Sequence, residues 1–143
     1  MSIKYSINKF FICVALISTF CFSNCYTLDE ELSDLLTIQE KITLLESGEW
    51  LLKGFEDRVM HTFKNGECFT FYGSDHVFSD VAIPETEVYT ARSSRLSIDS
   101  NAGNVKTYDV TFSCSNNIVE FFHEGTLNMT LYKRYSNYLD CLT

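Results

Sequence analysis

From Gly48 onward the chain alternates polar and apolar residues in short runs that are separated by turn sequences. Successive residues of a β-strand point to opposite faces, so these runs predict strands with one apolar and one mainly polar face. The breaks between them, such as Lys64-Asn65-Gly66 and Ser93-Ser94, are short and rich in turn-forming residues, which favours antiparallel hairpins between consecutive strands. The sequence therefore predicts a mainly β fold.

The pattern predicts eight strands and one long connection. The strands are Trp50–Asp57, Val59–Phe63, Cys68–Tyr72, Glu87–Arg92, Arg95–Asp99, Val105–Ser113, Ile118–Phe122 and Thr126–Arg134. Such a sheet must bury its apolar face, and an antiparallel up-and-down barrel does so while removing both open edges. The connection from Gly73 to Thr86 holds the only proline, and we predict that it forms a flexible loop or lid.

An amphipathic helix is predicted ahead of the strands, over Thr27–Ser47. Its leucines and isoleucines recur at steps of three and four, Asp29–Glu31 lie in its first turn, and Gly48 follows its end. Acidic residues match the helix dipole at the start, and glycine is a stop signal. We expect the apolar stripe to pack on the core of the barrel or to close one end of it.

The first 25 residues have the pattern of a secretory signal peptide. Lys4 and Lys9 precede an apolar run over 10–22, which is shorter than the roughly 20 residues of a transmembrane helix. Phe22–Cys25 resembles a loose form of the bacterial lipobox, so two outcomes stay open: lipidation of Cys25, or cleavage near it and release. We expect a secreted or outer-envelope protein with a signal peptide over 1–25, a helical segment over 26–47 and a barrel domain over 48–143.

Charge excludes one class of partner. The chain has 19 acidic and 11 basic residues, a net charge of −8, and without Lys4 and Lys9 the remainder has a net charge of −10. Such a field repels phosphates, so we predict no nucleic-acid binding and no membrane contact other than a lipid anchor at Cys25. We expect a monomer.

Three cysteines follow the signal segment: Cys68, Cys114 and Cys141. In an oxidising compartment an odd number is most simply explained by one disulfide and one free thiol. A bridge from Cys141 to Cys114 or to Cys68 would hold the C-terminus against the domain, and we predict Cys114–Cys141. No Cys/His spacing indicates a zinc site.

Residues at the two ends of the strand region carry a resemblance to a known family. Gly48-Glu49-Trp50, which lies at the start of the first strand, resembles the Gly-x-Trp signature of lipocalins and related calycin barrels. The resemblance covers roughly residues 47–135 and is closer to the compact lipocalin-like domains of secreted bacterial proteins and lipoproteins. It implies that Trp50 plugs the closed end of the barrel and that Arg134, in the last strand, packs across the indole ring.

The inward-facing aromatic side chains predict a ligand cup. Concave aromatic sites with a few polar groups commonly bind apolar or amphipathic molecules. The predicted ligand-binding residues are Trp50, His61, Phe69, Phe71, Tyr89, Tyr108, Phe112 and Phe121. We therefore predict a non-enzymatic protein that binds a small hydrophobic ligand. The alternative is a filled barrel that serves as a protein-interaction or inhibitor module, since eight strands leave room only for side chains or one small ligand.

Catalytic chemistry has little support in the sequence. His61, His76 and His123 are the candidates for acid–base work, but no nucleophile motif accompanies them and their spacing does not suit a metal. We predict no catalytic residues, no metal site and no cofactor. A hydrolase or isomerase that uses His61 inside the cup is the least favoured hypothesis.

Overall fold

The computed structural model describes residues 35–100 and 103–143, which form a closed antiparallel barrel. The predictions for the signal peptide, for Cys25 and for the helix before residue 35 lie outside the described residues. Around the barrel each strand pairs with its neighbours in the chain, and the ring closes because β1 pairs with β9. This is the predicted eight-stranded up-and-down barrel, with β4 added as a short hairpin strand beside β3.

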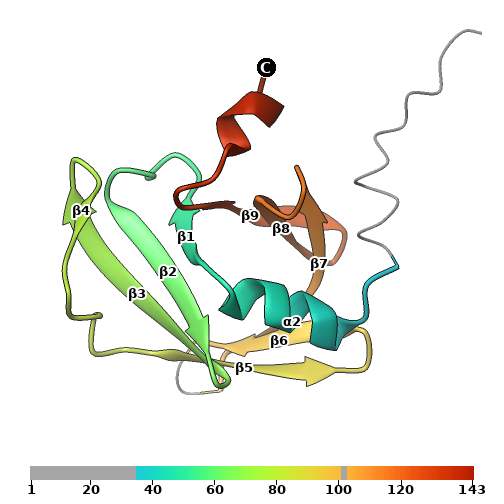
Figure 1. The fold of residues 1–143 in the computed structure, drawn as a ribbon. Helices are drawn as coiled ribbons and strands as arrows, with labels where there is room; N and C mark the ends of the chain where they lie inside the picture. The colour runs from blue at the N-terminus through green and yellow to red at the C-terminus, as the bar shows by residue number, and fades with distance from the viewer. Residues whose placement is uncertain (1–34, 101–102) are drawn as a thin grey trace, which may run out of the picture.

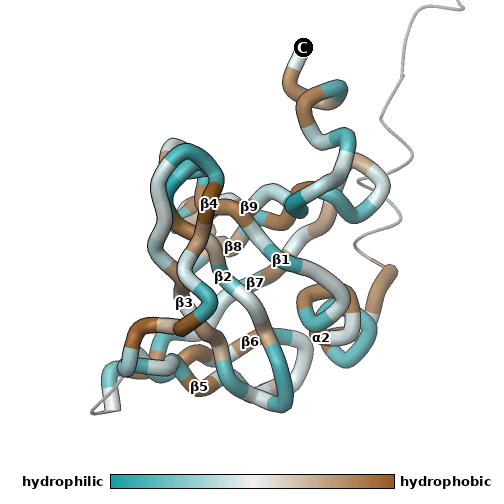
Figure 2. Tube along the Cα trace, turned by 60° about the vertical axis from the view of Figure 1, so that its left-hand side comes forward, coloured by the Kyte–Doolittle hydropathy of each residue, from teal (hydrophilic) through white to brown (hydrophobic). Residues whose placement is uncertain are grey.

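The elements follow one another with short connections, as Figure 1 shows. They are α2 (Ile38–Glu46), β1 (Glu49–Leu52), β2 (Val59–Lys64), β3 (Glu67–Ser74), β4 (Val77–Phe78), β5 (Glu87–Arg92), β6 (Arg95–Asp99), β7 (Val105–Ser113), β8 (Ile118–His123), β9 (Thr126–Lys133) and the 3-10 helix η1 (Tyr138–Cys141). Figure 2 shows hydrophobic and hydrophilic residues alternating along the chain.

Two predicted segments have different boundaries in the structure. The first strand ends at Leu52 and not at Asp57, because the chain turns at Gly54, whose φ of 83° lies in the left-handed region. The predicted loop after residue 72 is partly strand: Asp75 and His76 both have positive φ and form the two-residue turn of the β3–β4 hairpin.

The helix is shorter than predicted and begins at a capping box. The hydroxyl of Thr37 accepts from the backbone N–H of Glu40, and the Glu40 carboxylate accepts from the backbone N–H of Thr37. This reciprocal pair satisfies two backbone donors and fixes the helix start at Ile38. Leu35, which the prediction placed inside the helix, precedes it and is exposed.

The helix covers one end of the barrel, where the strands surround it in Figure 1. Ile42 and Leu45 are buried in the same apolar cluster as the inward-facing strand residues. The indole N–H of Trp50 donates to the carbonyl of Leu45 at 2.8 Å, and the ammonium of buried Lys41 donates to the carbonyl of Val110 at 2.6 Å. These contacts fix α2 to β1 and β7, so the helix acts as a plug.

A second apolar cluster lies on the outer face of the barrel. Leu51, Met60, Ile118 and Tyr132 are buried there under the C-terminal segment, and the ring of Tyr132 stacks on Tyr138 at 4.5 Å between centroids. The predicted Cys114–Cys141 disulfide holds this segment against β7, and Cys68 is a buried free thiol. Both outcomes agree with the cysteine prediction.

We predict that Leu45→Ala lowers the unfolding free energy by about 2–5 kcal/mol, because it leaves a cavity beneath the plug. Leu45 is 0% exposed, whereas Leu35 is 76% exposed, so Leu35→Ala is the matched control and should change stability little. Urea denaturation measures both. Equal effects of the two substitutions would show that α2 does not plug the barrel.

Removal of the disulfide by the double substitution Cys114→Ser/Cys141→Ser should lower stability by about 3–4 kcal/mol, given the 27-residue separation that the bridge closes. Reduction of the wild-type protein should bring its denaturation midpoint to that of the double variant and leave the variant itself unchanged. An identical midpoint for oxidised and reduced wild type would contradict the bridge.

Candidate functional site

The plugged end contains the glycine and tryptophan singled out from the sequence. Trp50 is fully buried and packs edge-on against Phe112, with ring centroids 6.1 Å apart. Gly48 lies beside the side chain of Lys133, and an added Cβ would come within 2.9 Å of its Cε atom. A larger residue at this position would require the lysine side chain to shift.

The cation over Trp50 is Lys133 and not Arg134, which corrects the prediction. Lys133 is the cross-strand partner of Trp50, and its ammonium lies 5.9 Å from the centre of the indole. Directly paired residues share a face of a sheet and the next residue points to the other side, so Arg134 lies outside the barrel. It forms an ion pair with Glu49 at 2.8 Å and lies over the ring of Phe78.

Most of the predicted cup residues form a solid core. The members with 8% exposure or less that pack together inside the barrel are Trp50, Tyr89, Tyr108, Phe112 and Phe121. Tyr108 meets Phe121 edge-on with ring centroids 5.9 Å apart, and Phe63 stacks on Phe121 at 6.4 Å. The half of the barrel next to the helix is therefore filled by side chains.

Phe69 and Phe71 lie on the outer face, contrary to the prediction. They are the cross-strand partners of Thr62 and Met60, and Phe71 packs on the outer cluster with Met60. The inward-facing residues of β3 are consequently Cys68, Thr70 and Tyr72. Aromatic character misled the sequence argument, because this strand has aromatic residues on both faces: Tyr72 faces inward, and Phe69 and Phe71 face outward.

A cleft of about 610 Å³ opens at the end of the barrel opposite the helix. Its apolar lining is Leu52, Phe55, Val59, Tyr72 and Ile83, and its polar lining is Arg58, His61, Thr70 and Glu87, with Gly73 completing it. These residues come from β1, β2, β3 and β5 and from two connections: Phe55 and Arg58 lie between β1 and β2, and Ile83 lies between β4 and β5. His61 is the one predicted ligand-binding residue that the structure places in this cleft.

The cleft exists because the barrel wall is incomplete on this side. β3 and β5 pair through only two residue pairs, Glu67 with Val88 and Cys68 with Glu87. Beyond them β3 is bordered by the connection that follows β4, whose Ile83 N–H donates to the carbonyl of Thr70 at 2.9 Å. The predicted lid thus supplies one wall of the cleft.

His61 is held in the cleft as a neutral imidazole. Its Nδ1 forms a 3.0 Å hydrogen bond with the hydroxyl of Thr70, while its Nε2 is buried without a hydrogen-bond partner among the described residues. Burial lowers the pKa of His61 from 6.5 to about 4, because removal from water penalises the charged form. At neutral pH the ring therefore carries no charge.

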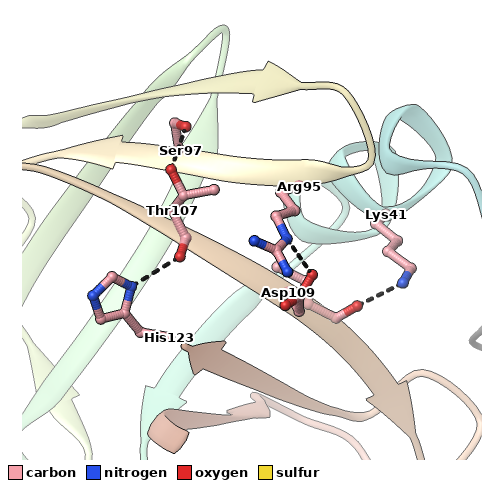
Figure 3. Close-up of polar contacts among 7 residues, drawn as sticks. Lys41, Arg95, Ser97, Thr107, Asp109 and His123 are labelled. Carbon is pink, nitrogen blue, oxygen red and sulfur yellow. Dashed lines mark hydrogen bonds and ion pairs between the residues drawn. The ribbon is translucent and has the colours of Figure 1, made fainter. Parts of the chain in front are cut away.

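The other histidines lie apart from the cleft. His76 is in the exposed β3–β4 turn. His123 ends β8, where its Nδ1 bonds the carbonyl of Thr107 at 3.0 Å, and Figure 3 shows this contact beside the 2.8 Å ion pair of Arg95 with Asp109. Within the described ranges, no three His, Cys, Asp or Glu side chains gather as metal ligands would.

Sequence reasoning missed Thr70, Tyr72, Ile83 and Glu87 as lining residues. Thr70 and Tyr72 can be located from the alternation of β3 if the count starts at Cys68, which is buried, and not at the aromatic residues. Ile83 belongs to an irregular connection, and the sequence there has no periodicity that predicts where its side chain points.

No known protein family, curated protein or solved structure matches this chain. In the part that the structure describes, no helix has the length and apolar character needed to cross a membrane.

The neutral state of His61 predicts a loss of stability on acidification. Its pKa is lower in the folded than in the unfolded protein, so the unfolded state binds more protons between about pH 4 and pH 6.5. The contribution of His61 to the free energy of unfolding is complete above pH 6.5 and falls by up to about 3 kcal/mol as the pH decreases to 4. His61→Gln should lack this component, as measured by urea denaturation at pH 4 and pH 7.5.

The matched control for this titration is His76→Gln, which changes an exposed histidine. The free energy of unfolding of this variant should depend on pH as it does in the wild type. The account of His61 fails if the two variants show the same dependence.

Proposed function

We propose that the protein is a non-enzymatic, exported binding protein that holds a small amphipathic ligand in the mouth of its barrel. The observation that carries this proposal is the 610 Å³ cleft opposite the plugged end. Its volume lies within the range of small-molecule sites, and its mixture of apolar walls with a few polar groups is typical of such sites.

The lining chemistry supports binding in place of catalysis. His61 bonds Thr70 and not a nucleophile, and its low pKa makes it a poor proton acceptor near neutral pH. The aromatic ring of Phe55 and that of Tyr72 are about half exposed at the rim, where a ligand can cover them. The resemblance of Gly48-x-Trp50 to the lipocalin signature supports the same function.

Export is the second element of the proposal. The signal-like pattern of residues 1–25 suggests a secretory route, and a Cys114–Cys141 disulfide is compatible with an oxidising compartment outside the cell. Lipid attachment at Cys25 or release after cleavage remain the two alternatives for the mature form.

The alternative function is a protein-interaction or inhibitor module. The filled half of the barrel favours it, because the side chains of Trp50, Phe112 and Phe121 are fully buried in the core next to the helix.

Titration with N-phenyl-naphthylamine, whose fluorescence rises in apolar sites, tests the binding proposal. We expect saturable binding with one probe per chain. Val59→Trp places a large side chain in the cleft and should weaken binding about tenfold or more. Val88→Trp is the matched control, because Val88 lies on the outer face next to inward-facing Tyr89.

Binding that Val59→Trp and Val88→Trp weaken equally would show that the probe is not in the cleft. Absence of any saturable fluorescence increase would remove the proposed function and favour the interaction module.

A further inference from the structure

A carboxylate on the inner face of β5 has no partner in the described structure. Glu87 is the cross-strand partner of Cys68, which is buried in the core cluster, so both side chains point toward the barrel interior. Glu87 also lines the cleft and is half-buried. No hydrogen bond or ion pair engages its carboxylate within residues 35–100 and 103–143.

The field of this carboxylate reaches the interior of the barrel. Glu87 adds to the burial effect that raises the pKa of the Cys68 thiol to about 12, and it also contributes to the raised pKa of Tyr108. Cys68 and Tyr108 belong to β3 and β7, on either side of β5 and β6 around the barrel. The negative charge of Glu87 therefore acts on groups inside the barrel as well as on the cleft that it lines.

The basic residues nearby do not neutralise this charge by direct contact. Arg58, at the rim, is paired with Asp57 at 3.3 Å and lies over the ring of Phe55. Lys106 faces inward by its alternation with Tyr108, but it is not part of the cleft lining and forms no ion pair with Glu87 in the described chain. A half-buried carboxylate in an apolar site gains most from a cation that enters with the ligand.

We propose that the ligand is an organic cation, with an ammonium group that pairs with Glu87 and an apolar body that lies against Phe55, Tyr72 and Ile83. This inference rests on the proposed function, since it names the ligand class of the same cleft. The aromatic rings suit a cation with an apolar body, and the net charge of −8 attracts cations from solution.

Calorimetric titration with phenethylamine, phenethyl alcohol and phenylacetate tests the proposal, because the three compounds share one aromatic body and differ in charge. We expect the affinity for the amine to be higher than that for the alcohol by about tenfold or more. Phenylacetate should bind more weakly than either. In Glu87→Gln the amine should lose this advantage, so that the amine and the alcohol bind with similar affinity, and a urea denaturation curve shows whether the variant is folded.

Glu85→Gln is the matched control. It removes the same charge two residues away, in the exposed connection before β5, and should keep the preference for the amine. Equal binding of the three compounds to the wild type, or equal effects of the two substitutions, would overturn the cation proposal and leave the cleft as a binding site. If none of the compounds binds and N-phenyl-naphthylamine does not bind either, the proposed function fails as well.

Discussion

The pairing of β1 with β9 is the interaction on which the rest of the structure depends. Trp50, Leu51 and Leu52 pair with Lys133, Tyr132 and Leu131, and this short ladder converts a meander with two open edges into a closed barrel. The same contact brings Trp50 under α2 and the Lys133 ammonium over the indole. Closure of the barrel and attachment of the plug therefore both depend on Trp50.

Closure produces two ends with different properties. Large aromatic and aliphatic side chains fill the end under the helix. At the other end β1 stops at Leu52, β3 leaves β5 after two residue pairs, and the inward positions of β2 and β3 hold smaller or polar residues such as Val59 and Thr70. The space that results is the cleft of about 610 Å³ at the mouth of the barrel, a volume that suits a small molecule.

Much of the fold could be predicted from the sequence because two local signals agree. Alternation gave the strands and short turns gave the hairpins, and sequential hairpins leave few topologies other than a meander. The odd number of cysteines predicted one bridge and one free thiol, but the sequence argument itself left Cys114 and Cys68 open as partners of Cys141. The predicted strand boundaries were less accurate where one or two residues with positive φ end a strand, as at Gly54 and at the turn of Asp75 and His76.

The site was harder to predict because the register of a strand decides whether each side chain points into the barrel or out of it. Phe69 and Phe71 contribute to an outer cluster that the C-terminal segment covers, so hydrophobicity alone did not identify the inner face of β3. The confusion of Arg134 with Lys133 is also a displacement by one residue, which reverses the facing of a side chain. Glu87 was placed in a strand, but its isolation from other charges is visible only in three dimensions.

The position of a bound ligand tests the account most directly. Intermolecular nuclear Overhauser effects from N-phenyl-naphthylamine to isotopically labelled protein report which side chains it contacts. The account predicts contacts with the Ile83 methyl groups and the Tyr72 ring, and none with Phe112 or Trp50. Contacts with Phe112 or Trp50 would mean that the barrel interior opens, and contacts confined to Phe71 would place the ligand on the outer face. Either result would contradict a filled barrel with its site at the mouth.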